Sequence, residues 1–179
     1  MGEISSIDWP AGDFTRVPYR LYTDADVFER EMARIFHGSS WAYVGLESEL
    51  PETWDYLTTQ IGNRSVVVTR DDKGELHAFA NRCAHRGVKV CRQQRGNSRF
   101  FICPYHQWSY DAEGSLRGVP FIKGVGGNGG MPEDFSQADN ALPRLKIAVR
   151  NGVIFASFSE DVEDLEAYLG ENNLQYFDR

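Results

Sequence analysis

The stretch CAHRGVKVCRQQRGNSRFFICPYHQW runs from Cys83 to Trp108 and holds all three cysteines and two of the four histidines of this 179-residue chain. One residue separates Cys83 from His85, and two residues separate Cys103 from His106. Thiolate and imidazole groups suit zinc, copper or iron–sulfur centres, and they do not suit calcium or magnesium. The spacing therefore predicts one metal centre held by two Cys–His pairs on separate loops.

A single zinc ion is the first alternative for this centre. Structural zinc sites usually have two to four residues between paired ligands, and their ligand atoms lie within roughly 3.6 Å of one another. On an extended backbone, the Cβ atoms of residues 83 and 85 would lie about 6.6 Å apart. Side chains can converge over that distance, so zinc stays open. A binuclear centre fits more easily, because Cys83 can bind one iron and His85 the other.

The complete pattern, C-x-H-x17-C-x2-H with Gly87 and Pro104 in its loops, resembles the signature of the Rieske proteins. In a Rieske [2Fe–2S] cluster, two histidines replace two cysteines on one of the two irons. The resemblance implies that this cofactor is bound by Cys83, His85, Cys103 and His106, with the two cysteines on one iron. Neutral imidazoles make the cluster less negative, so it accepts a single electron more readily.

Three residues that bind no metal separate two branches of this family. Respiratory Rieske proteins have a disulfide between the two cluster loops and a serine whose hydroxyl group hydrogen-bonds to a cluster sulfide. Val88 and Tyr105 stand at the positions of the disulfide cysteines, and Trp108 stands at the position of the serine. Loss of that hydrogen bond lowers the reduction potential, because the bond stabilises the reduced, more negative cluster. The sequence resembles the low-potential, ring-hydroxylating branch.

Most of the chain resembles the N-terminal part of the large (α) subunits of Rieske aromatic-ring-hydroxylating dioxygenases. The mixture of motifs is more similar to oxygenases of aromatic carboxylates, of the terephthalate, anthranilate and salicylate kind. Many members of the family have glycine after the second ligand histidine, where this chain has Gln107. The motifs that carry the resemblance are TRVPYRLYTD (15–24), IFHGSSWAYVGLESELP (35–51), NRCAHRG (81–87), CPYHQWSYDAEGSLRGVPF (103–121) and GGMPEDF (129–135).

This resemblance implies a role in electron transfer. The large subunit receives electrons from an NAD(P)H-dependent reductase, a ferredoxin or both, and it works beside neighbouring α subunits, with or without a β subunit. Its Rieske cluster passes the electrons to a mononuclear non-haem Fe(II), held by two histidines and a carboxylate in a C-terminal catalytic domain. His37 and His77 remain, and neither lies in an Asp-x-x-His-x4-His array. We therefore expect no catalytic residue in this chain, and no oxygenation by this chain alone.

Two other functions stay open beside this one. The first is a stand-alone Rieske ferredoxin, which is an electron carrier and not a part of an enzyme. The N-terminal helix and the glycine-rich segment 124–135 exceed what a minimal carrier needs, which disfavours it. The second is a zinc-stabilised interaction module. Colour distinguishes the two kinds of metal, because a Rieske protein is red-brown and a zinc protein is colourless.

Short apolar segments separated by turn residues predict a mainly β fold with flanking helices, arranged as an antiparallel sandwich or small barrel. The resemblance identifies it as a Rieske-type sandwich with a small cluster-binding subdomain at about 81–121. We expect an N-terminal arm and helix in 1–39, the Rieske domain in 40–160, and a C-terminal helix with the start of the missing catalytic domain in 161–179. The expected strands are 41–46, 55–61, 65–70, 75–80, 100–102, 107–110, 115–116, 147–149 and 152–158.

Helical spacing is present on both sides of these strands. Thr23 and Asp26 have the spacing of a capping box, which predicts a helix with Thr23 as its N-cap. The apolar residues that follow, from Phe28 to Phe36, recur at helical spacing and predict a helix packed on a core, ending near Gly38. Val162, Leu165 and Leu169 predict a second helix that ends at Gly170.

The net charge of −7 argues against a nucleic-acid partner. Six basic residues and no acid lie between Arg82 and Arg99, and we expect this basic segment to dock an acidic ferredoxin or a neighbouring α subunit, or to be a solvated surface. No apolar run is long enough for a membrane helix, and the N-terminus lacks a signal-peptide pattern. Three cysteines cannot all pair, which favours a reducing cytoplasm and predicts that Cys91 is a free, partly buried thiol.

Overall fold

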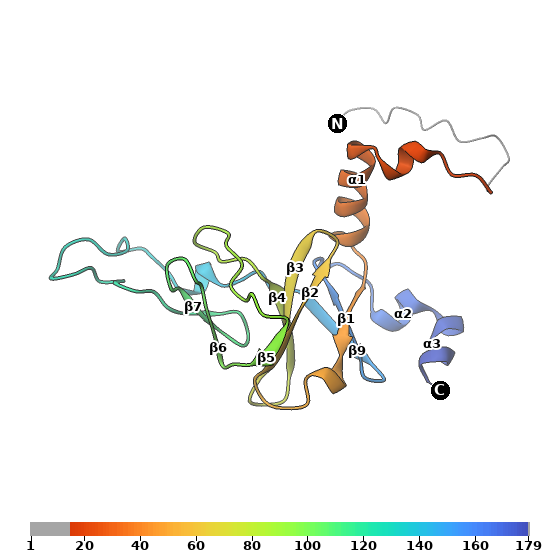
Figure 1. The fold of residues 1–179 in the computed structure, drawn as a ribbon. Helices are drawn as coiled ribbons and strands as arrows, with labels where there is room; N and C mark the ends of the chain where they lie inside the picture. The colour runs from red at the N-terminus through yellow and green to blue at the C-terminus, as the bar shows by residue number, and fades with distance from the viewer. Residues whose placement is uncertain (1–14, 179) are drawn as a thin grey trace.

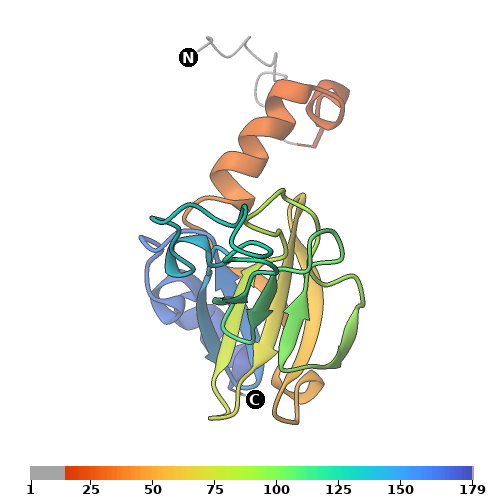
Figure 2. The same cartoon turned by 90° about the vertical axis from the view of Figure 1, so that its left-hand side faces the viewer.

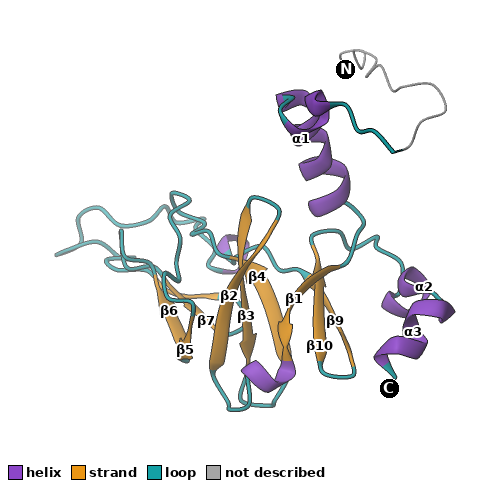
Figure 3. Ribbon diagram, turned by 45° about the vertical axis from the view of Figure 1, so that its right-hand side comes forward, coloured by secondary structure: helices purple, strands orange, loops and turns teal. Residues whose placement is uncertain are grey.

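Two antiparallel β-sheets share one core, and a third, smaller sheet extends from one side of them (Figure 1). The structure is a computed structural model that describes residues 15–178, so the first part of the expected N-terminal arm lies outside the described residues. Helices lie near the two ends of the chain, and long loops gather around the small sheet (Figure 3). The predicted fold class, mainly β with flanking helices, is confirmed.

The four-stranded sheet has the strand order β4-β3-β2-β5, and its strand β3 (Arg64–Arg70) is buried on both faces. Val66 and Val68 contribute to the core shared with the other large sheet, whereas Val67 contributes to the core shared with the small sheet. Side chains alternate along a strand, so a strand covered on both faces needs a continuous apolar run. The other strands are β2 (Asp55–Ile61), β4 (Leu76–Ala80) and β5 (Arg95–Asn97).

The second large sheet has the order β1-β10-β9, with both pairs antiparallel. Val44 and Ile154 from this sheet pack against Leu57 of β2 in the shared core. This burial joins the first and last strands of the chain to the middle of the four-stranded sheet. The strands are β1 (Ala42–Leu46), β10 (Val153–Ser157) and β9 (Lys146–Arg150).

The small sheet is a meander of three short strands in the order β6-β7-β8. Its inner face packs on the four-stranded sheet through aromatic rings: Phe101 meets Phe79 edge-on at 5.7 Å, and Tyr110 is completely buried in the same core. Edge-to-face pairs of this kind add to the free energy of burying the rings. The strands are β6 (Phe100–Ile102), β7 (Ser109–Asp111) and β8 (Leu116–Gly118).

The N-terminal helix stands away from the sheets (Figures 1 and 2). It consists of α1 (Ala25–Glu31) and a π-helical turn (Met32–Phe36). The N-cap is Asp24, whose carboxylate accepts hydrogen bonds from two backbone N–H groups, so the prediction of Thr23 as the cap is wrong by one residue. A carboxylate at this end also complements the helix dipole.

Met32 is the only buried residue of these two helical elements, so the predicted packing of an amphipathic face on the core is wrong. The physical reason lies in the sheets. Both faces of the four-stranded sheet are already covered by other strands, which leaves no open sheet face for this helix. Shorter 3₁₀ helices lie at Tyr19–Tyr22, Glu47–Glu49 and Ala138–Asn140.

The C-terminal region forms α2 (Leu165–Leu169) and α3 (Glu171–Phe177), separated by Gly170. Gly170 has a φ of 73°, a left-handed value that ends the first helix. The pair packs on Trp41 and Phe155 in a third, smaller core. The second of these helices was not predicted, because Gly170 is a typical helix C-terminal residue and no apolar periodicity follows it. No helix in residues 15–178 is long and apolar enough to cross a lipid bilayer.

Each predicted strand is present: 55–61 and 100–102 have the predicted ends, and the others have ends shifted by one or two residues. Strand β5 was not predicted, because its sequence, Arg95-Gly96-Asn97, has no apolar alternation. It pairs along β2, with Asn97 opposite Asp55 and Arg95 opposite Leu57. Backbone hydrogen bonds to a neighbouring strand hold it, and these leave no signal in the side-chain pattern.

Candidate metal centre

The two loops that carry the Cys–His pairs have the same backbone geometry. In the first loop, the N–H of Cys83 donates to the carbonyl of Val88 at 2.8 Å, and the N–H of Gly87 donates to the carbonyl of Cys83 at 2.8 Å. In the second loop, the corresponding bonds run from Cys103 to Trp108 at 2.8 Å and from Gln107 to Cys103 at 3.0 Å. Each cysteine therefore begins a tight loop that its own peptide groups close.

Both loops need a left-handed backbone at their fifth residue. Gly87 has a φ of 72°, and Gln107 has a φ of 58°. Glycine reaches this region at little cost, whereas a residue with a Cβ atom is strained there. Gln107, the residue that departs from the family pattern, therefore keeps the loop geometry at the expense of local strain.

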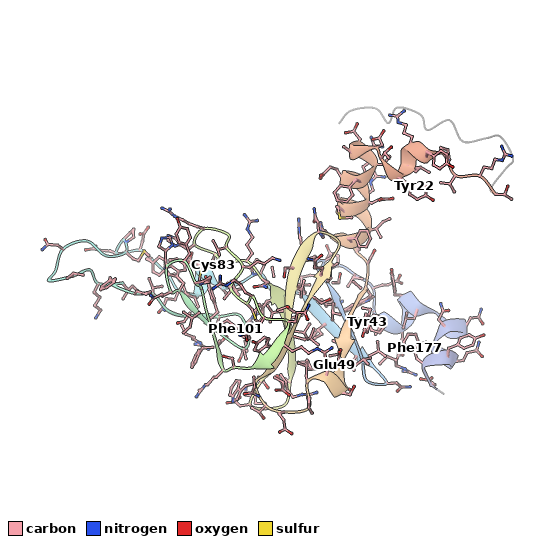
Figure 4. All side chains as sticks on the ribbon, in the orientation of Figure 1. Tyr22, Tyr43, Glu49, Cys83, Phe101 and Phe177 are labelled. Atoms are coloured by element: carbon pink, nitrogen blue, oxygen red, sulfur yellow. The ribbon has the colours of Figure 1, made fainter. Side chains whose placement is uncertain are left out.

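The structure brings the four predicted residues together at the loop-rich end of the molecule. Figure 4 shows Cys83 at this end, on the other side of the sheets from Phe177. The side chains of Cys83 and Cys103 are buried, and burial followed by the neighbouring Cys83 thiol raises the pKa of the Cys103 thiol. The rings of His85 and His106 lie 4.6 Å apart at an angle of 68°.

The Nδ1 atoms of His85 and His106 are buried and have no hydrogen-bond partner. A buried polar atom without a partner loses about 1–3 kcal/mol of solvation free energy, so native proteins rarely leave one unexplained. Burial, followed by the charges of His106 and Arg86, lowers the pKa of His85 and favours its neutral form. Neutral imidazole nitrogens beside two cysteine sulfurs are the donor set of a Rieske [2Fe–2S] cluster, so the residues present fit that group.

The distances between donors distinguish one metal from two. Within residues 15–178, no three donor atoms of Cys83, His85, Cys103 and His106 lie within 4.8 Å of one another. Tetrahedral zinc needs all four donors within roughly 3.6 Å of each other. The donors instead form a sulfur pair and an imidazole pair, which favours a binuclear centre over a single zinc ion.

A different group, Asp71, Glu75 and His77, does have donor atoms that close together. The Asp71 carboxylate already has three partners: it accepts hydrogen bonds from the backbone N–H groups of Lys73 and Glu75 and contacts Nε2 of His77 at 2.9 Å. These bonds close the turn between β3 and β4. His77 therefore has a structural role in this turn.

Tyr110 is a residue of the centre that sequence reasoning missed. Its hydroxyl oxygen accepts a hydrogen bond from the backbone N–H of Ala84 at 3.1 Å and lies 3.3 Å from the sulfur of Cys83. Because the N–H of Ala84 occupies the oxygen as an acceptor, the O–H is free to donate to the Cys83 sulfur. Burial raises the pKa of Tyr110 and keeps this proton in place. The available signal was its position in a predicted strand, four residues before Gly114 of the following turn.

Aromatic rings and an apolar hollow surround the two histidines. Trp108 stacks on His85 with ring centres 4.7 Å apart. The ring centres of Tyr105 and His106 are 3.9 Å apart. An open hollow of about 360 Å³ borders both imidazoles, and most of its exposed surface is apolar. It is lined by His85, His106, Gln107, Trp108, Pro120, Phe121 and Met131.

The basic segment divides into paired and unpaired cations. Arg95 forms an ion pair with Glu49, and Arg99 lies over the rings of Trp54 and Phe100. The remaining four are exposed and have no acidic partner in the part of the chain that the structure describes. These four, Arg82, Arg86, Lys89 and Arg92, therefore form an uncompensated positive surface beside the first loop.

Cys91 is buried in the same stretch but takes no part in the centre. Its peptide group is held by Asn81, which accepts from the N–H of Cys91 at 2.8 Å and donates to its carbonyl at 2.6 Å. Its thiol lies against the carbonyl of Gln93 at 3.5 Å. The prediction of a free, buried thiol is confirmed.

Comparison with known proteins agrees with this geometry. Residues 40–128 match the sequence pattern of the Rieske [2Fe–2S] domain. The chain is 48% identical over 175 residues to the large oxygenase component of salicylate 5-hydroxylase from Ralstonia sp., covering 96% of this chain and 41% of that protein. It is 45% identical over 177 residues to the large subunit of anthranilate 1,2-dioxygenase from Burkholderia cepacia, covering 99% of this chain and 42% of that one.

A solved structure supports the same conclusion. The naphthalene 1,2-dioxygenase from Rhodococcus sp., bound to indole, superimposes with a TM-score of 0.76 at 38% identity, over 89% of this chain and 35% of that one. The chain thus spans less than half the length of the proteins it matches. The loop geometry, the donor set and these similarities lead to one conclusion: the chain belongs to the Rieske [2Fe–2S] domain family and corresponds to the N-terminal Rieske region of the large subunits it resembles.

Proposed function

We propose that this chain is the electron-transfer region of an aromatic-ring-hydroxylating oxygenase, with Cys83 and Cys103 on one iron of a [2Fe–2S] cluster and His85 and His106 on the other. The observation that carries this assignment is the pair of buried, unpartnered Nδ1 atoms beside two buried thiols. The matched loops support it further, because each loop supplies one sulfur and one imidazole. When bound, the cluster would accept and release single electrons.

The residues of the chain have separate tasks around that cluster. Burial of Cys83 and Cys103 excludes water from the sulfur side. Tyr110 donates a proton in a hydrogen bond to the Cys83 sulfur, which favours the more negative, reduced state. His85 and His106 border the apolar hollow, so a redox partner can approach most closely on the imidazole side.

The whole protein would use this region to supply electrons to a mononuclear non-haem Fe(II) in a catalytic domain beyond this chain. The names of two relatives, salicylate 5-hydroxylase and anthranilate 1,2-dioxygenase, favour an aromatic carboxylate as the substrate class. We place the Rieske domain in 40–160, with its cluster-binding subdomain at about 81–121. The three cysteines form no disulfide in the described residues, which favours a reducing compartment, such as the cytoplasm.

The proposed electron donor is a reductase or ferredoxin with an acidic surface, and the proposed neighbours are further α subunits, with or without a β subunit. The four unpaired cations support the first part of this proposal, because complementary charge accelerates encounter between proteins. Changing Arg86 and Lys89 to Glu is expected to slow reduction by an acidic ferredoxin, more at low than at high ionic strength. Reduction by dithionite is the control, and an unchanged ferredoxin rate would assign these cations to a solvated surface.

Metal content and spectroscopy test the central assignment. The purified chain is expected to be red-brown, to contain two irons and two sulfides, and to give a Rieske-type EPR signal with two histidine nitrogens when reduced. C83S and H106A should lose this signal, whereas C91S, which removes the third buried thiol, should keep it. A colourless chain with one zinc ion would contradict the proposal and support the interaction module. The reduced chain is expected to form no product from an aromatic carboxylate and O₂.

A further inference from the structure

Trp108 contacts both cluster loops. Its backbone carbonyl accepts the N–H of Cys103 within the second loop, and its indole stacks on His85 of the first loop. The two rings are 4.7 Å apart and only 11° from parallel. Trp108 is itself 4% exposed and meets the edge of Phe135. The indole is therefore a fixed surface against which the imidazole lies flat.

An imidazole bound to a metal through one nitrogen can rotate about the metal–nitrogen bond. In most metal sites, a hydrogen bond to the second nitrogen prevents this rotation. With Nδ1 on the metal, the second nitrogen is Nε2, and in residues 15–178 Nε2 of neither His85 nor His106 has a hydrogen-bond partner. The flat contact with Trp108 is the restraint that the structure offers to His85 instead.

The second imidazole is restrained differently. Tyr105 lies over His106, but the two rings are tilted by 31° and Tyr105 is 55% exposed. Tyr105 also belongs to the same loop as His106, so this contact does not join the loops. Flat stacking on a buried ring of the other loop is therefore specific to His85.

We infer that Trp108 is a positioning residue that sets the plane of the His85 imidazole and joins the two cluster loops without a covalent bond. Cys83, Cys91 and Cys103 form no disulfide in the described residues, so the connection between the two loops is non-covalent. The stacked pair supplies it. This inference rests on the proposed function, because it gives His85 a metal to bind.

The test compares the loaded wild-type chain with W108L, W108F and W41L. Trp41 is a second buried tryptophan, which packs in the core beneath the C-terminal helices, away from the loops. Two readouts are measured: the hyperfine couplings of the two histidine nitrogens by pulsed EPR, and the rate at which an iron chelator removes the cluster. W108L is expected to change the coupling of one nitrogen and to accelerate cluster loss about tenfold, the effect of losing a residue that supports a metal ligand.

W108F keeps a flat ring, so its couplings and its rate should stay close to those of the wild type. W41L should leave both couplings unchanged, even where it lowers the melting temperature. The inference is overturned if W108L leaves the couplings unchanged, or if W108F is as disruptive as W108L. If W108L does not take up the cluster, W108F and W108Y are measured in its place, because both keep a flat ring. Loss of the cluster in both of these variants would also overturn the inference.

The wild-type spectrum separates this result from the proposed function. A wild-type signal without histidine nitrogens would contradict the ligand assignment itself. A wild-type signal with two histidine nitrogens, combined with unchanged couplings in W108L, would contradict the role of Trp108 alone.

Discussion

The hydroxyl group of Tyr110 offers the sharpest test of how the protein controls the reduction potential. Its oxygen is 3.3 Å from the sulfur of Cys83, and the N–H of Ala84 holds it in place from the other side. Tyr110→Phe removes the hydroxyl and keeps the buried ring. The cluster becomes more negative on reduction, so the lost hydrogen bond had stabilised the reduced state more than the oxidised state. The variant should therefore have a lower potential.

The size of the shift follows from the strength of the bond. A hydrogen bond to a charged group contributes about 1.5–3 kcal/mol, and only the difference between the two redox states affects the potential. If that difference is about 1 kcal/mol, the potential falls by about 40 mV, because 59 mV corresponds to 1.4 kcal/mol for one electron. An EPR-monitored redox titration measures the shift.

Tyr56→Phe is the matched control. Tyr56 is also a buried tyrosine of the same core, but its hydroxyl donates to Gln93 at 2.9 Å and contacts no cysteine ligand. The control should lose stability without a change in potential. A shift of less than ~10 mV in Tyr110→Phe, an upward shift, or an equal shift in Tyr56→Phe would refute the reasoning.

Three further predictions concern stability. Gln107→Gly should raise the free energy of unfolding by about 1 kcal/mol, since φ is 58° there, and Gly87→Ala should lower it by a similar amount; urea denaturation measures both. Burial opposes ionisation of Asp71, but hydrogen bonds from His77 and two backbone N–H groups outweigh it and lower the pKa of that carboxyl. The stabilisation is present above the unfolded pKa of about 3.9 and is lost as pH falls through the lower folded value, so Asp71→Asn should flatten the loss of stability below about pH 4 in urea titrations. Arg150→Ala removes ion pairs to the C-terminal helices, so its melting temperature should fall, and the difference from wild type should shrink in high salt.

The fold was largely predictable because most of its signals are local. Turn residues and apolar alternation gave the strands on either side of the cluster loops, and the run of three valines in β3 marks a strand buried on both faces. Strand β5 was not predicted, because an edge strand of three mostly polar residues is held by backbone pairing with β2 and shows no apolar pattern. The N-terminal helix was predicted as a helix but wrongly placed on the core. The spacing of its apolar residues shows that the helix has an apolar face. Whether a sheet face is free to pack against that helix depends on how the sheets pack on one another, which the helix sequence does not show.

The spacing of Cys83, His85, Cys103 and His106 determined by itself that a metal centre of thiolate and imidazole donors was expected. The reason is that each metal prefers particular donor atoms, and that the cysteine and histidine of each pair are close in the sequence and so lie in one short loop. The tertiary structure groups the donors in the way that the resemblance implies, with sulfur beside sulfur and imidazole beside imidazole, which favours two metals over one. It also decided that Tyr110 contacts Cys83 and that Trp108 stacks on His85. Each of those contacts joins residues more than twenty positions apart. The distances between them depend on how β7 and the two loops pack, and the spacing of residues along the chain does not determine that packing.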